Sequence, residues 1–119
     1  MSLKSPYVLL ALVMMGFVVM SLLTKSAEAV YCTQSFAQHE QPVVLFGTTW
    51  CGYCRKARNF FAENNIAYCE YDVEASTANQ QTFTELGGNG VPLIVIGEER
   101  LDGFNESALR RALRNKGLL

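Results

Sequence analysis

A pair of cysteines separated by two residues constrains this chain more than any other feature. Cys51 and Cys54 follow a short apolar run at residues 43–46, and the turn residues 47–49 lie between the run and the pair. Such a run, rich in β-branched side chains, is typical of a buried interior strand. The sequence therefore predicts a strand, a tight turn and a helix that carries both cysteines in its first turn.

The residues after the pair have the period of an amphipathic helix. Its apolar side chains are predicted to share one face: Ala57, Phe60 and Phe61. The cationic side chains are expected to reach water: Arg55, Lys56 and Arg58. The helix is expected to end at Asn64–Asn65.

The position of the two cysteines predicts thiol–disulfide exchange. A thiolate is the attacking species, and unpaired N–H groups at a helix start lower a cysteine pKa from about 8.5 to about 3.5–7.5. Cys51 is therefore expected to be the nucleophile. Cys54, one turn further along, is expected to resolve the mixed disulfide that Cys51 forms.

A zinc site is the alternative reading of a Cys-x-x-Cys pair, and it requires two further ligands. Only Cys32, Cys69 and His39 are available to supply them, and none of these forms a second closely spaced pair. We therefore expect no metal site.

The first thirty residues predict an export signal. Lys4 precedes an apolar run at 7–23, and Ala27-Glu28-Ala29 fits the small-x-small pattern of signal peptidase sites. An uncleaved N-terminal membrane anchor is the alternative, with residues 7–23 as the only membrane contact. We divide the chain into a signal peptide or anchor (1–29), a polar lead-in (30–41) and a single domain (42–119).

An exported destination changes the interpretation of the other cysteines, because disulfides persist outside the cytoplasm. Cys32 and Cys69 are candidates for a structural disulfide, and two independent thiols are the alternative. The formal net charge of −1 offers no basic field for nucleic acid, so we expect no nucleic-acid partner.

The rest of the chain reads as alternating strands and helices. Strands are predicted at 67–73 and 93–96 and from residue 100, a helix at 76–86, and a last helix from Asn105. The order β-α-β-α-β-β-α predicts an α/β fold, a four-stranded mixed sheet flanked by helices and preceded by the N-terminal hydrophobic helix.

Three motifs resemble the glutaredoxin family of the thioredoxin-like superfamily: Cys51-Gly52-Tyr53-Cys54, Gly90-Val91-Pro92 and Gly103-Phe104. The resemblance spans residues 42–113 and implies a thioredoxin-like fold. It also implies a cis proline at Pro92 beside the redox disulfide, and a Val91 main chain that binds substrate like an added strand. Tyr53 and Asn105 would then contact substrate or glutathione.

The chain also departs from the family pattern. Gly52 stands where glutaredoxins usually have proline, and Thr48 where the glutathione site often has lysine. Asp102 and Glu106 flank Asn105 and would repel a glutathione carboxylate. Thioredoxins carry a buried aspartate where this chain has Leu45.

We therefore predict an exported, monomeric thiol–disulfide oxidoreductase of glutaredoxin type. Its expected substrates are proteins with disulfides or glutathione mixed disulfides, and its electron donor is a reductase or glutathione. No tightly bound cofactor is expected, and glutathione is a candidate co-substrate. The alternatives are a redox-inert peptide-binding module and a glutathione-dependent iron–sulfur carrier.

Overall fold

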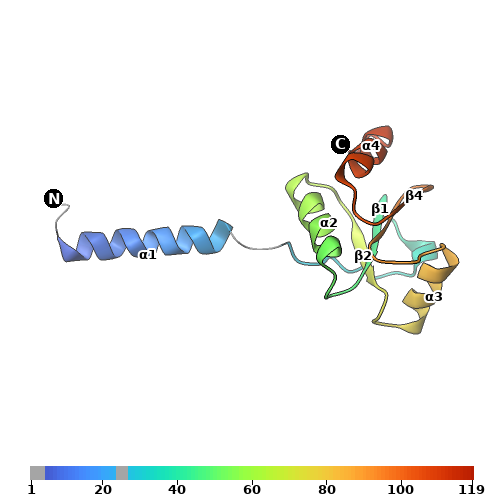
Figure 1. The fold of residues 1–119 in the computed structure, drawn as a ribbon, viewed down its shortest axis with the longest axis horizontal. Coiled ribbons are helices and arrows are strands. Elements are labelled where there is room, and N and C mark those ends of the chain that lie inside the picture. Colours follow the sequence, from blue (N-terminus) through green and yellow to red (C-terminus); the bar gives the residue numbers. More distant parts are fainter. Residues whose placement is uncertain (1–4, 24–26) are drawn as a thin grey trace.

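The computed structural model describes residues 5–23 and 27–119 (Figure 1). Its elements follow the chain in this order: α1 (Pro6–Leu23), a short 3-10 helix η1 (Phe36–Gln38), β1 (Val43–Gly47), α2 (Gly52–Glu63), β2 (Cys69–Asp72), α3 (Thr77–Glu85), β3 (Leu93–Ile96), β4 (Glu99–Asp102) and α4 (Glu106–Asn115).

The four strands form one mixed sheet in the order β2-β1-β3-β4. β1 runs parallel to β2 and antiparallel to β3, and β3 pairs with β4 in an antiparallel hairpin. β1 is thus a central strand, and all five of its residues are buried. The predicted α/β fold with a four-stranded mixed sheet is confirmed.

Alternating side chains divide the core between the two faces of the sheet. One face carries Val43 and Leu45 of β1 and packs against α2 and α4. The helices supply its apolar cover: Ala57, Phe60, Phe61, Leu109, Ala112 and Leu113. Helix α2, which follows the turn from β1, is therefore packed on this face of the sheet.

The opposite face carries Val44 and Phe46, which pack with Tyr71 of β2. Phe83 of α3 and Phe36 of η1 cover this face, and both contact the ring of Phe46. Helices thus cover both faces, as the element order predicts.

Helix α1 lies apart from the sheet and its flanking helices (Figure 1). Large apolar side chains along it are exposed, among them Tyr7, Leu10, Val13 and Phe17. In the described part of the chain, no helix has both the length and the apolar character needed to cross a membrane. Lys4, which we assigned to the charged start of a signal peptide, lies outside the described residues.

The segment before β1 is more than a polar lead-in, because it extends the sheet at the outer edge of β2. Tyr31 forms a parallel bridge with Glu70, whose N–H donates to Val30 O at 2.7 Å. Cys32 N–H donates to the Glu70 carbonyl at 2.9 Å, and Cys32 is joined to Cys69 by a disulfide. The disulfide therefore attaches this segment to the sheet.

Candidate active site

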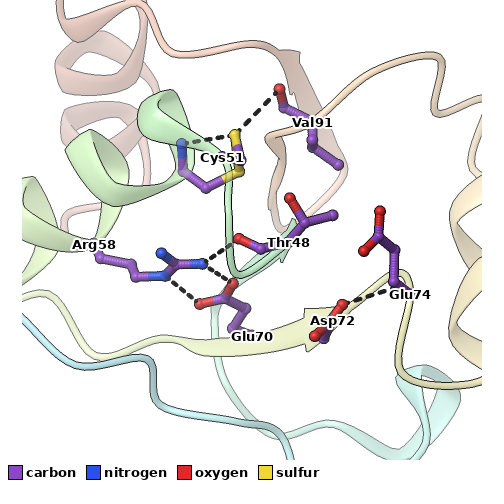
Figure 2. Close-up of polar contacts among 8 residues, drawn as sticks. Thr48, Cys51, Arg58, Glu70, Asp72, Glu74 and Val91 are labelled. Carbon is purple, nitrogen blue, oxygen red and sulfur yellow. Dashed lines mark hydrogen bonds and ion pairs between the residues drawn. A yellow bond between two sulfur atoms is a disulfide. The ribbon is translucent and has the colours of Figure 1, made fainter.

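The two cysteines lie where β1 turns into α2. Cys51 has an extended backbone and occupies the N-cap position, and α2 begins at Gly52. The main-chain N–H of Cys54 donates to Cys51 Sγ at 3.1 Å (Figure 2). The sulfur thus takes the place of the side-chain oxygen that usually caps a helix. The partial positive charge of the helix start is directed at this atom.

Cys51 and Cys54 are joined as a disulfide. Both residues are buried, with 5% of Cys51 and none of Cys54 accessible to solvent. Cys51 Sγ lies 3.8 Å from the carbonyl oxygen of Val91 (Figure 2). An attacking group therefore reaches Cys51 more readily than Cys54.

The loop before β3 forms the opposite wall of the site. The peptide bond between Val91 and Pro92 is cis, as the family resemblance implies. Pro92 is fully buried, and its carbonyl accepts a hydrogen bond from Gly103 N–H at 2.8 Å. The structure thus brings Cys51, Cys54, Val91 and Pro92 together.

The two other predicted site residues, Tyr53 and Asn105, have different surroundings. Tyr53 is 60% exposed, with the ammonium of Lys56 5.0 Å from the centre of its ring. Asn105 caps α4, because its Oδ1 accepts a hydrogen bond from Ala108 N–H at 3.0 Å. The Asn105 side-chain oxygen is therefore engaged by its own helix.

The expectation that Arg58 reaches water is wrong. Arg58 is 7% exposed and forms an ion pair with Glu70, which is 1% exposed. Arg58 Nε lies 2.8 Å from Glu70 Oε2 and Nη2 lies 2.6 Å from Oε1, while Nη2 also donates to Thr48 O at 2.9 Å. The guanidinium thus joins α2, β2 and the turn that leads to Cys51 (Figure 2).

Helix geometry explains the burial of Arg58. Positions 54, 57, 58 and 61 form one stripe of a helix, and here that stripe faces the sheet. In β2, alternation places Glu70 on the same sheet face as Tyr68, toward α2. The position of Arg58 among the apolar residues of this stripe is the sequence signal that could have predicted a buried ion pair. The hydrogen bond and charge of Glu70 raise the pKa of Arg58 despite its desolvation, so the guanidinium remains charged.

Gly47 lies next to both this ion pair and Cys54. A Cβ added to Gly47 would lie 2.8 Å from Glu70 Oε1 and 3.2 Å from Cys54 Sγ. The first distance is shorter than real Cβ contacts, so a larger residue would displace the carboxylate. The absence of a side chain here lets the Arg58–Glu70 pair and the Cys54 sulfur pack at the end of β1.

The candidate zinc ligands are engaged elsewhere. Cys32 and Cys69 are bonded to each other, and His39 Nδ1 contacts the carbonyl oxygen of Phe36. Within residues 5–23 and 27–119, no three His, Cys, Asp or Glu side chains gather in a cluster suited to a metal ion.

Comparison with known proteins agrees with this geometry. The sequence model of the glutaredoxin family matches residues 43–101. A glutaredoxin of Pseudomonas aeruginosa is 30% identical over 80 residues, which cover 66% of this chain and 95% of that protein. The chain belongs to the glutaredoxin family. It is thus a thiol–disulfide oxidoreductase by family, as the Cys51–Cys54 pair predicts.

Solved structures support the fold of this glutaredoxin family member. A glutaredoxin of Archaeoglobus fulgidus superposes with a TM-score of 0.60 at 18% identity, covering 70% of this chain and 97% of that one. A thioredoxin-like protein superposes with a TM-score of 0.57 at 26% identity, covering 60% of this chain and 99% of that one.

The buried ion pair predicts a large effect of a small substitution. Glu70→Gln leaves the Arg58 charge buried without its partner, so the free energy of unfolding should fall by about 3–5 kcal/mol. Glu106→Gln makes the same chemical change in an exposed pair with Arg110, and should cost about 1 kcal/mol or less. Urea unfolding followed by circular dichroism measures both values. Equal losses in the two variants would contradict a stabilising role for the buried pair.

Proposed function

We propose that this protein exchanges disulfides through both cysteines, with Cys51 as the nucleophile and Cys54 as the resolving thiol. The observation that carries the proposal is the 3.1 Å hydrogen bond from Cys54 N–H to Cys51 Sγ at the start of α2. In the reduced protein, the same donor stabilises negative charge on that sulfur. Cys51 is therefore the thiol that reacts as a thiolate near neutral pH.

The exchange proceeds in two steps. The Cys51 thiolate attacks one sulfur of a substrate disulfide, forms a mixed disulfide and releases the other substrate sulfur as a thiolate. Cys54 then loses its proton and attacks Cys51 Sγ, which forms the Cys51–Cys54 disulfide and releases the second substrate thiol. Two electrons pass to the substrate, and two donor thiols, or one donor dithiol, return the protein to the dithiol form and are themselves oxidised to a disulfide.

The position of the Val91 main chain, in the loop before β3, supports a role for this loop in substrate binding. The Val91 carbonyl lies 3.8 Å from Cys51 Sγ, and Pro92 is held by the hydrogen bond from Gly103. An extended substrate segment that pairs with the Val91 main chain would place its sulfur beside Cys51. The exposed ring of Tyr53 offers a second contact for the substrate.

We propose disulfide-containing proteins or glutathione mixed disulfides as substrates, and a reductase or glutathione as the electron donor. Glutathione then acts as a co-substrate and not as a resident cofactor. The exchange requires one protein chain, because both cysteines lie in the same helical turn, and we propose that the protein acts as a monomer.

Single cysteine substitutions test the order of the two thiols. Cys51→Ser should reduce turnover of a protein disulfide to the uncatalysed background, since Cys54 is fully buried. Cys54→Ser should retain the first step and accumulate a covalent mixed disulfide with the substrate, visible by mass spectrometry under non-reducing conditions. If Cys54→Ser loses the first step and Cys51→Ser retains it, the assigned roles are reversed.

We further propose that the protein is exported and that residues 1–29 are removed. The Cys32–Cys69 disulfide supports an oxidising compartment, where such bonds persist. Helix α1 exposes its apolar side chains and lies apart from the domain core, which suits a segment that the mature protein does not need (Figure 1). Ala27-Glu28-Ala29 supplies the small residues of a cleavage site.

Export predicts a defined mature protein. Intact-mass analysis of protein recovered from the extracytoplasmic fraction of a bacterial host should give a chain that begins at Val30 and is four hydrogens lighter than its fully reduced form. The mass difference corresponds to two disulfides, Cys32–Cys69 and Cys51–Cys54. A full-length chain found only in the cytoplasm would contradict the proposal.

A further inference from the structure

A groove of 610 Å³ begins beside the redox disulfide and runs toward α3. Trp50, which directly precedes Cys51, and Val91, which contacts the Cys51 sulfur, both line it. Glu74, Thr77, Gln80 and Phe83 line the part that lies toward and along α3. A substrate whose sulfur reaches Cys51 from this side therefore has its neighbouring residues in the groove.

Only one of the residues that line this groove carries a charge, and it is Glu74. Its Oε1 accepts a hydrogen bond from Trp50 Nε1 at 3.0 Å, which holds the carboxylate close to the residue before Cys51. The main-chain N–H of Glu74 donates to Asp72 Oδ1 at 2.8 Å, so a second carboxylate lies next to the Glu74 main chain (Figure 2). The groove is thus negatively charged.

No cation of α2 lines this groove: Arg58 reaches the carbonyl oxygen of the lining residue Thr48, but its charge is paired with Glu70. Arg55 and Lys56 are exposed and do not line it, and the Lys56 ammonium lies over the ring of Tyr53. Thr48, at the position where the family often has a lysine, is buried among the lining residues and is uncharged. An anionic group in the groove therefore meets Glu74 with no basic side chain to neutralise it.

We propose that Glu74 discriminates between the two substrate classes proposed above: the groove favours a polypeptide segment with neutral or basic residues next to its disulfide over the anionic glutathione mixed disulfides. This inference rests on the proposed exchange at Cys51. Its physical basis is charge complementarity beside the reacting sulfur, which acts on the first step, when the substrate docks. Glutathione, with two carboxylates and one ammonium, carries the disfavoured charge.

Matched peptide disulfides test the proposal. The probes are symmetrical disulfides of the capped dipeptides Cys-Lys, Cys-Gln and Cys-Glu, together with oxidised glutathione. The rate constant of the first step is measured with the reduced Cys54→Ser protein, which leaves Glu74 and the groove unchanged. For each probe, the rate is compared between this protein and the same protein carrying Glu74→Gln, so intrinsic differences among the probes cancel.

Glu74→Gln should slow the lysine probe and accelerate the glutamate probe and oxidised glutathione, each by roughly threefold, the factor for one pair of unit charges about 7 Å apart in water. The glutamine probe should be unchanged. These differences should disappear near 1 M salt, where the screening length is about 3 Å. Gln retains an oxygen that can accept the Trp50 hydrogen bond, so the groove keeps its shape.

Glu63→Gln is the matched control, because it removes the same charge from the far end of α2, roughly 18 Å along the helix from Cys51. It should leave all four rates unchanged. If Glu74→Gln alters none of the charged-probe rates, or if Glu63→Gln alters them equally, selection by Glu74 is wrong and the exchange function stands. If even the neutral probe fails to react with Cys51, the proposed function itself fails.

Discussion

The main-chain N–H of Cys54 points at the sulfur of Cys51 from 3.1 Å, and the chemistry of this domain depends on that contact. A sulfur at a helix start faces donors that have no partner within the helix. These donors favour negative charge on the sulfur, so a thiolate forms there more easily than on a thiol in water. In the proposed exchange, the position of this one sulfur atom at the start of α2 thus determines which cysteine attacks.

The surrounding fold keeps this contact in place. β1 is buried between two strands and covered on both faces, so its end, from which the turn to Cys51 departs, has little freedom to move. The ion pair of Arg58 with Glu70 joins α2 to β2, and its bond to Thr48 O fixes the turn itself. The cis peptide at Val91–Pro92 closes the opposite side. Core packing and a buried charge pair therefore position the sulfur together.

Local patterns in the sequence predict most of the fold, because strand alternation, helix periodicity and the Cys-x-x-Cys spacing are all short-range signals. The contribution of Arg58 could not be predicted from its charge alone, since cations on a helix usually face water and its partner Glu70 lies on another element. The pairing of Tyr31 with Glu70 was missed for a similar reason. The segment at 30–41 lacks an apolar strand pattern, and a disulfide with a distant cysteine holds it instead.

The ionisation of Cys51 tests most directly whether the start of α2 stabilises its thiolate. The reduced protein is alkylated with iodoacetamide across pH 4–10, and mass spectrometry follows modification at Cys51 and Cys54 separately. Because Cys54 N–H faces Cys51 Sγ, we expect the alkylation rate at Cys51 to rise with an apparent pKa below about 7.5, while Cys54 reacts only at higher pH. A Cys51 profile centred near the ordinary thiol value of about 8.5 would contradict it.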